Sequence, residues 1–382
     1  MNQPLPAPHR AGATVEFQHV TKRYGSGSDG PCAVDDLSLQ VPAGRICVLV
    51  GPSGCGKTTS LKMVNRLIEP SAGRILIDGR DVAAEEPTAL RRRIGYVIQQ
   101  VGLFPHQTIG ENVGTVPRLL GWSPAQRRER TDELLGLVGL EPATYRERYP
   151  SQLSGGERQR VGVARALAAD PPLMLMDEPF GAVDPIVRER LQNEFLRLQA
   201  GLAKTILFVT HDIDEAIKMG DLVAVMQGDG TLAQYGPPAG ILANPASDFV
   251  ARFVGADRGL KRLSLTRVRD VALRPATTVR AGELASADQR LAAEGSAGYL
   301  LLVDDDARPV GWIDTSDLPT DAVVRTDLAV PMSPLLEPET TLKDALSMLL
   351  DASVQQGIAV DPAGRVLGLL SVEAITSRLD ER

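Results

Sequence analysis

The sequence predicts an α/β protein with a parallel sheet at its core, and three observations support that class. Short, continuous apolar runs occur at residues 46–50, 173–177 and 205–211, with the length and composition of buried parallel strands. Segments with helical spacing lie between these runs, and Gly and Pro mark the boundaries. The run at 46–50, ICVLV, leads directly into the glycine-rich loop GPSGCGKT and then into a helix-forming segment.

Length and composition limit the number of domains and the class of protein. The chain has 382 residues, of which 43% are hydrophobic and 23% charged, and this favours a globular protein with two or three domains. Its apolar runs are far shorter than the roughly 20 residues that a membrane-spanning helix needs. We expect residues 1–12 to form a flexible leader without a signal peptide. Cys32, Cys47 and Cys55 lack a metal-binding spacing, which favours a reducing cytoplasm.

The net charge of −7 is unevenly distributed along the chain. Residues 257–382 contain 14 Lys and Arg against 20 Asp and Glu, although the first part of this region, 257–280, is basic. A solvated surface is the simple explanation. Attraction between the basic and acidic parts, or to an anionic membrane, is an alternative that high salt would weaken. The sequence contains no cluster of basic residues that would indicate binding to nucleic acid.

Strands and helices follow in a clear order around the glycine-rich loop. Residues 15–25 and 33–41 have the pattern of antiparallel edge strands. Residues 99–149 are rich in Arg, Leu and Glu at helical spacing, so we expect a helical subdomain at about 99–160. Residues 223–236 indicate a hairpin that turns at GDG.

Residues 51–58, GPSGCGKT, match the phosphate-binding pattern G-x-x-x-x-G-K-[ST] after a strand and before a helix, which is the context it requires. Its glycines let backbone N–H groups converge on phosphate oxygens, and the helix N-terminus adds positive charge. Lys57 can reach the β and γ phosphates, and Thr58 can ligate Mg²⁺. A plain glycine-rich turn is the weaker alternative. The residues predicted to bind ATP here are Gly51, Pro52, Ser53, Gly54, Cys55, Gly56, Lys57, Thr58 and Thr59.

Two adjacent carboxylates, Asp177 and Glu178, end the apolar run at 173–177. In a phosphate-binding site they suit two roles. Asp177 can hold Mg²⁺ through its water shell, and Glu178 can orient or deprotonate the water that attacks the γ-phosphate. An acidic strand end that only caps the next helix is the alternative.

Residues 153–160, LSGGERQR, place a Ser-Gly-Gly turn at the start of a helix, between the phosphate loop and the acidic strand end. With these motifs in this order, residues 14–255 resemble the ATP-binding cassette (ABC) ATPases. The resemblance implies a P-loop NTPase domain at 13–255 with a RecA-like core, an antiparallel β subdomain and the helical subdomain. It also implies a homodimer in which the turn contacts the ATP of the opposite subunit. The contacts implied across that dimer come from Ser154, Gly155, Gly156 and Asp184.

The same resemblance assigns roles to single residues elsewhere. Gln99 in VIQQVGLFPH is similar to the family's Q-loop glutamine, with Gln100 leaving a one-residue ambiguity. Tyr24 is similar to the aromatic residue that stacks on adenine, although a half-buried strand tyrosine is a fair alternative. His211 resembles the switch histidine that contacts the γ-phosphate. The implied catalytic residues are thus Glu178, His211 and Gln99, and the implied Mg²⁺ ligands are Thr58, Gln99 and Asp177.

Two positions depart from the usual family pattern. Glu157 follows Gly-Gly where Gln is common, and Val183 replaces a usual Leu. Both changes are conservative, so we expect ATPase activity to be retained.

Longer segments narrow the resemblance. SGCGKTTSLKMVNRLIEPSAG, RRRIGYVIQQVGLFPH and MDEPFGAVDPIVR resemble the ATPase subunits of bacterial uptake systems for glycine betaine, carnitine, choline and proline. This implies a peripheral protein on the cytoplasmic face of the inner membrane, integral-membrane permease partners and, indirectly, a solute-binding protein. The alternatives are an importer ATPase for another small solute, or a soluble ABC ATPase outside transport. The latter typically has two cassettes in one chain or a long coiled-coil insertion, and neither is visible here.

The C-terminal third contains an internal repeat. After a linker expected at 256–264, residues 265–322 and 323–382 share one order of elements. Each has a helix-prone run, a short apolar strand, a turn with Asp or Gly, and a second strand leading into a helix. The repeat resembles a pair of CBS domains, an α+β regulatory module that often binds an adenine nucleotide between its halves.

The nucleotide pattern of that module is incomplete in this chain. Asp314 replaces the usual Thr or Ser, while Asp317 is kept as a possible ligand. The second repeat has Ser371, but Ala374 stands where an acidic residue is usual. An extra carboxylate at Asp314 would repel a phosphate. Nucleotide sensing and a purely structural or dimerising module are therefore equal alternatives.

Overall fold

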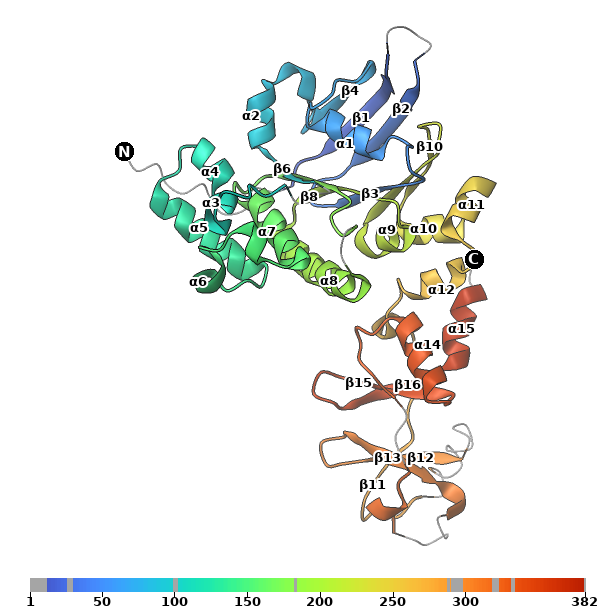
Figure 1. The fold of residues 1–382 in the computed structure, drawn as a ribbon. Helices are drawn as coiled ribbons and strands as arrows, with labels where there is room; N and C mark the ends of the chain where they lie inside the picture. Colours follow the sequence, from blue (N-terminus) through green and yellow to red (C-terminus); the bar gives the residue numbers. More distant parts are fainter. Residues whose placement is uncertain are drawn as a thin grey trace. The chain divides into compact units, whose positions relative to one another are not determined.

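A computed structural model gives the fold of the chain, which forms two compact units, Met1–Gly255 and Ala256–Arg382 (Figure 1). Among the residues that it describes, no helix is long and apolar enough to cross a membrane. The described residues are 12–25, 30–98, 102–181, 184–286, 289, 298–317, 323–330 and 334–380.

The core of the first unit is a six-stranded sheet. Its strands are β3 (Ile46–Val50), β6 (Ile94–Val97), β7 (Leu173–Asp177), β8 (Thr205–Thr210), β9 (Leu222–Met226) and β10 (Leu232–Gly236). They lie in the order β10-β9-β3-β8-β7-β6, and all neighbours pair in parallel except β9 and β10. The three apolar runs form β3, β7 and β8, whose residues are all buried. The predictions of a parallel core and of a hairpin at 223–236 are confirmed, and the structure places that hairpin at the edge of the sheet.

A four-stranded sheet packs on this core. It contains β1 (Val15–Arg23), β2 (Cys32–Val41), β4 (Ala72–Ile77) and β5 (Arg80–Asp81), in the order β2-β1-β4-β5. The antiparallel pairing of β1 with β2 was predicted, but the prediction that β1 is an edge strand is wrong. β4 pairs with its other side, so that Phe17 lies opposite Ile75. Both side chains are buried in one hydrophobic core with Leu49 and Leu61. The backbone of β1 is paired with β2 on one edge and β4 on the other, so neither edge is open.

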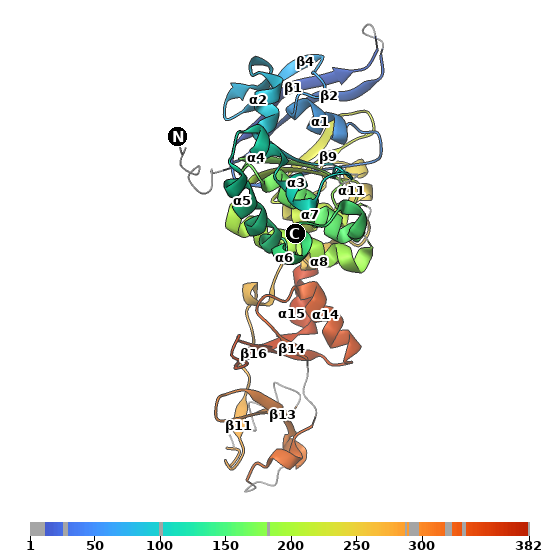
Figure 2. The same ribbon diagram turned by 60° about the vertical axis from the view of Figure 1, so that its left-hand side comes forward.

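Short helices fill the region predicted as a helical subdomain, and residues 99–101 at its start lie outside the described residues. Thr108 and Ser123 begin two of these helices with reciprocal capping hydrogen bonds. The helices gather on the side of the first unit away from the four-stranded sheet (Figures 1 and 2). They are α3 (Ile109–Val113), α4 (Thr115–Leu119), α5 (Pro124–Leu137), α6 (Pro142–Tyr145) and α7 (Gly155–Leu167).

The remaining helices of the first unit flank the six-stranded sheet or follow it in the chain. They are α1 (Lys57–Val64), α2 (Pro87–Arg92), α8 (Pro185–Leu202), α9 (Ile213–Met219), α10 (Pro238–Ala243) and α11 (Asp248–Val254), with 3₁₀ turns at Val82–Ala84 and Pro150–Gln152.

The second unit contains two three-stranded sheets with the same pairing pattern, as the internal repeat predicts. One consists of β11 (Thr278–Arg280), β12 (Tyr299–Val303) and β13 (Pro309–Asp314), and the other of β14 (Leu335–Leu336), β15 (Gln356–Val360) and β16 (Val366–Ser371). In each sheet the first pair is parallel and the second antiparallel. The helices are α12 (Arg258–Leu263), α14 (Leu342–Asp351) and α15 (Val372–Asp380), with 3₁₀ turns at Val268–Asp270, Thr315–Asp317 and Thr326–Leu328.

The two halves of this unit are interleaved, which differs from the predicted boundaries. The segment predicted as a linker forms α12, and its Leu263 is buried with Leu342 and Ile375 of the second half. Conversely, Val324 was assigned to the second repeat but is buried with Leu300 in the first half. Each sheet is too small to bury its own apolar face. A segment from beyond the predicted repeat boundary therefore packs against that face.

Candidate active site

The phosphate-binding loop begins where the buried strand β3 ends. Gly56, the last residue before α1, has φ of 90°, a backbone conformation that favours glycine. A Cβ atom on Gly56 would lie 2.0 Å from the carbonyl oxygen of Ala33 in β2. The loop therefore passes against the four-stranded sheet so closely that it has no room for a side chain at this position.

The N-terminus of α1 faces this loop, and no side chain caps it within the described residues. Its first backbone N–H groups are therefore able to bind an anion. Lys57 is buried and folds back over the loop, where its Nζ donates hydrogen bonds to the carbonyl oxygens of Gly51 at 2.8 Å and Pro52 at 2.9 Å. Both acceptors are neutral carbonyls, so a phosphate oxygen could replace them with a stronger, charge-assisted bond.

Thr58 and Asp177, both predicted Mg²⁺ ligands, are brought together from α1 and β7. The Thr58 hydroxyl donates a hydrogen bond of 2.9 Å to the Asp177 carboxylate. Burial raises the pKa of Asp177, while the hydrogen bond from Thr58 opposes this rise. No group of three or more His, Cys, Asp and Glu side chains that could hold a metal occurs in the described part of the chain. The pair still fits Mg²⁺, because this ion typically takes one or two protein oxygens together with water and phosphate oxygens.

Glu178 follows Asp177 in a strained backbone conformation. Its φ is +44°, which is uncommon for a residue with a side chain, and its N–H donates a 3.0 Å hydrogen bond to the carbonyl of Val209. This turn directs the carboxylate to His211 at the end of β8, with 3.1 Å between Glu178 Oε1 and His211 Nδ1. The side chain of His211 is 59% exposed and that of Glu178 is 22% exposed, so both groups can contact a ligand.

Of the remaining residues singled out in the sequence, Tyr24 lies after β1 and three others are not described. Tyr24 is 43% exposed just after β1, and the Lys22 ammonium lies 5.3 Å from the centre of its ring. Its ring is therefore accessible for stacking on a base. Gln99, Gln100 and Val183 lie outside the described residues.

The Ser-Gly-Gly turn, residues 154–156, opens α7 and is exposed at Ser154 and Gly155. Gly156 lies against α8, because a Cβ atom there would be only 3.3 Å from a methyl group of Val187. Among the described residues, no hydrogen bond or ion pair joins this turn to the phosphate loop at 51–58. Instead, the N–H and the hydroxyl oxygen of Ser154 form hydrogen bonds with Glu157 in the first turn of α7.

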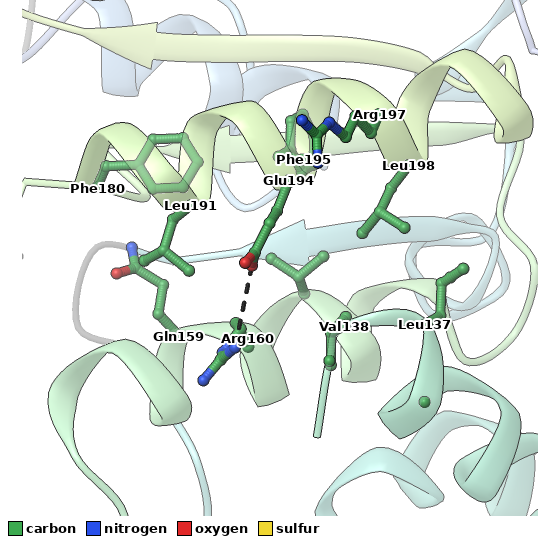
Figure 3. Close-up of a pocket in the computed structure, with 13 residues that line it drawn as sticks. Leu137, Val138, Gln159, Arg160, Phe180, Leu191, Glu194, Phe195, Arg197 and Leu198 are labelled. Atoms are coloured by element: carbon green, nitrogen blue, oxygen red, sulfur yellow. Dashed lines mark ion pairs between the residues drawn. The ribbon is translucent and has the colours of Figure 1, made fainter. Parts of the chain in front are cut away.

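Helix α8 runs beside α7 and begins at the predicted interface residue Asp184. The Asp184 carboxylate accepts a 3.0 Å hydrogen bond from the N–H of Ile186, which is itself 84% exposed. Between α7 and α8 lies a mostly apolar cavity of about 280 Å³ (Figure 3). Arg160 on α7 points across it to Glu194 on α8, with 3.9 Å between the charged atoms. The predicted interface residues therefore lie at the starts of two adjacent helices.

Sequence reasoning missed the structural role of Glu157 and its partner Tyr145. Glu157 caps the start of α7 together with Ser154, and it accepts a hydrogen bond from the Tyr145 hydroxyl on α6. The pattern Ser154-x-x-Glu157 is a recognisable capping box and was a usable signal. No local pattern indicates Tyr145, because its contact depends on how α6 packs.

Many nucleotide-binding proteins have a parallel sheet with a phosphate loop. A helix that begins at an exposed Ser-Gly-Gly turn, as α7 does here, distinguishes the ATP-binding cassettes. The first unit is a cassette of that class. The ABC transporter family matches residues 34–181. Given this match and the relatives below, the chain belongs to the family of ABC transporter ATP-binding proteins.

Two relatives and one solved structure support this assignment. The osmoprotectant import ATP-binding protein OsmV of Salmonella typhimurium is 44% identical, over 96% of this chain and 96% of its own. The glycine betaine/carnitine/choline transport ATP-binding protein OpuCA of Bacillus subtilis is 43% identical, over 94% of each chain. The cassette MJ0796, solved as a dimer in a post-hydrolysis state with ADP and Pi, is 34% identical, with a TM-score of 0.53 over 59% of this chain and 98% of that one. The predicted ABC cassette fold, ABC transporter ATPase class and resemblance to osmoprotectant importer subunits are confirmed.

Proposed function

We propose that this chain is the ATP-hydrolysing subunit of a bacterial importer for quaternary-amine osmoprotectants, namely glycine betaine, carnitine, choline or L-proline. The observation that carries the proposal is its similarity to OsmV and OpuCA along nearly the whole length of each chain, because both are named for the import or transport of such solutes. The chain acts at the cytoplasmic face of the inner membrane, where it binds permease subunits that receive the solute from a separate binding protein.

ATP binds at the N-terminus of α1. Lys57 exchanges the carbonyls of Gly51 and Pro52 for the β and γ phosphate oxygens, and the glycine loop supplies backbone N–H groups. Tyr24 offers its exposed ring to the adenine. Thr58 and Asp177 would hold Mg²⁺, which when bound would neutralise charge that develops on the phosphates.

Hydrolysis requires a water placed in line with the γ-phosphate. Glu178 orients and deprotonates that water, and the strained turn at its φ of +44° fixes the carboxylate in place. His211, 3.1 Å from Glu178, would contact the γ-phosphate. The family resemblance assigns contact with the metal and the water to Gln99, which lies outside the described residues. Burial raises the pKa of Asp177, and the positive charge of a bound Mg²⁺ would oppose this rise by favouring the ionised form.

Two copies of the cassette complete each site. Ser154, Gly155 and Gly156 contact the ATP held by the second copy, and Asp184 lies at the seam between them. The exposed turn at the start of α7 supports this arrangement, as does the dimeric state of MJ0796. Closure of the two copies around ATP moves the permease, and hydrolysis resets it.

Uptake experiments test this function. Cells that lack the protein receive either the unchanged chain or Glu178→Gln, and uptake of labelled glycine betaine, carnitine, choline and proline is measured. We expect the unchanged chain to restore uptake of at least one of these solutes and Glu178→Gln to restore none. Restoration of a different solute, or of no solute while a permease copurifies, would contradict the proposed substrate class.

For the second unit we propose a CBS module that binds an adenine nucleotide. A cleft of about 540 Å³ supports this, because it is lined by both halves, with Thr278, Arg280 and Glu283 on one side and Val366 on the other. Asp314 is turned away from a ligand role, since its carboxylate accepts hydrogen bonds from the backbone and hydroxyl of Ser316. The backbone of Asp317 ends the next 3₁₀ turn, and its side chain lies outside the described residues.

Calorimetry with AMP, ADP and ATP on the full chain tests this module. Lys57→Ala removes binding at the cassette, so the binding that remains reports on the second unit. We expect Arg280→Ala to weaken that remaining binding at least tenfold. A module with only a structural or dimerising role would give no heat in the Lys57→Ala background.

A further inference from the structure

Glu157 connects the Ser-Gly-Gly turn to the helix α6. One of its carboxylate oxygens accepts a 2.7 Å hydrogen bond from the backbone N–H of Ser154. The other accepts a 2.5 Å hydrogen bond from the hydroxyl of Tyr145, the last residue of α6. In return, the Glu157 N–H donates to the Ser154 hydroxyl oxygen at 3.3 Å. The carboxylate therefore joins two groups, the Ser154 N–H of the turn and the Tyr145 hydroxyl of α6.

This carboxylate stays ionised and lacks a close counter-charge. The hydrogen bonds from Tyr145 and then from Ser154 lower the pKa of Glu157 to about 2. No Lys, Arg or His nitrogen of the described residues lies within 4.0 Å of it. Arg160, three residues further along α7, points to Glu194 (Figure 3), and its charge lowers the pKa of Glu157 less than the hydrogen bonds do. A full negative charge thus persists in the first turn of α7 at neutral pH.

The position of this charge matters for the dimer. In the proposed composite site, Ser154 contacts the γ-phosphate of the ATP held by the second copy. The start of a helix favours one anion, and Glu157 already satisfies that preference from within the chain. An arriving phosphate meets a like charge in the same turn, although the Ser154 O–H can still donate to it, because the hydroxyl oxygen only accepts from the Glu157 N–H.

We propose that Glu157 is a positioning residue that weakens the hold of the Ser-Gly-Gly turn on the ATP of the second copy, so that the dimer closes only at high ATP concentration. This rests on the proposed function, because it requires Ser154 to contact ATP across the dimer. The hydrogen bond from Tyr145 holds the Glu157 carboxylate in place. The negative charge of this carboxylate repels the phosphate of the ATP held by the second copy.

ATP-dependent dimerisation of the full chain tests the proposal in a Glu178→Gln background, which keeps ATP intact. Light scattering gives the ATP concentration at half-maximal dimer formation. Glu157→Gln keeps an acceptor for the Ser154 N–H but removes the charge. We expect it to lower that ATP concentration about three- to thirty-fold in 50 mM salt, the range for like charges several ångströms apart near a protein surface.

Salt and a matched variant separate charge from structure. In 1 M salt the Debye length falls to about 3 Å, so the difference between Glu157→Gln and its parent should shrink below twofold. Tyr145→Phe removes the hydrogen bond to α6 but leaves the charge, which the Ser154 N–H still holds in the turn, so we expect no fall in the required ATP concentration. An equal effect of Glu157→Gln at both salt concentrations, or no effect at either, would overturn the proposal.

Ser154→Ala distinguishes the two levels of inference. We expect it to raise the required ATP concentration at least tenfold. If Ser154→Ala does so and Glu157→Gln changes nothing, the role of Glu157 is refuted while the composite site stands. If Ser154→Ala has no effect, the proposed contact across the dimer fails, and the role of Glu157 fails with it.

Discussion

Replacement of Gly56 by alanine tests how tightly the phosphate loop is packed, and Gly54→Ala is its matched control. Both glycines have positive φ, +90° for Gly56 and +84° for Gly54, so an alanine at either site costs about 1–2 kcal/mol in backbone strain. Only Gly56 also meets an obstacle, since its Cβ would lie 2.0 Å from the Ala33 carbonyl, whereas Gly54 has nothing within 4 Å. Moving that backbone adds a further cost of about 1–3 kcal/mol.

Thermal unfolding without nucleotide measures this difference. For a unit of this size, 1 kcal/mol corresponds to about 2–4 °C in Tm, so Gly56→Ala should melt about 2–12 °C below Gly54→Ala. The loss should appear in the transition of the first unit and not in that of the second. Equal melting temperatures for the two variants would show that the backbone of β2 moves at no cost, and that the loop is not tightly packed against it.

Three further predictions concern the chemistry of the site. Glu178→Gln should reduce ATP hydrolysis about 10²- to 10⁴-fold in a phosphate-release assay and leave ATP binding intact; normal hydrolysis would remove Glu178 from the role of general base. Thr58→Val loses a metal ligand and the hydrogen bond to Asp177, so the Mg²⁺ concentration for half-maximal hydrolysis should rise about 10- to 100-fold, and an unchanged requirement would contradict the assignment. The pKa of Glu157 is lowered to about 2, so its contribution to stability is present above the unfolded value of about 4.3 and is lost as pH falls towards 2. Tyr145→Phe should therefore lower Tm at pH 7 more than at pH 2, and an equal loss at both values would show that the hydrogen bond does not depend on the ionised carboxylate.

The parts of the site that sequence reasoning could predict are those encoded locally. A strand, a glycine loop and a helix follow one another at residues 46–64, so the geometry of the loop depends on neighbours in the chain. Asp177 and His211 end adjacent parallel strands, and such strands deliver their last residues to the same edge of a sheet. Their meeting with Thr58 and Glu178 therefore needed little knowledge of the rest of the fold.

Long-range packing accounts for what the sequence did not reveal. β1 resembles an edge strand in its own pattern, and only the distant β4 makes it an interior one. The exchange of Leu263 and Val324 between the halves of the second unit depends on which apolar faces need cover, and a repeat pattern cannot show this. Tyr145 and Glu157 lie on different helices, so their hydrogen bond depends on the angle between α6 and α7.

The positive φ of Glu178 implies a trade-off between stability and activity at the centre of the site. Every residue except glycine is disfavoured there, and the proposed mechanism gives a reason for a glutamate, because it uses the carboxylate as general base. A glycine at position 178 would relieve that strain and give an inactive protein that is more resistant to unfolding than the active one. Under the proposed mechanism, selection for stability alone would thus remove the general base, and a glutamate at this position is expected only where ATP turnover is selected.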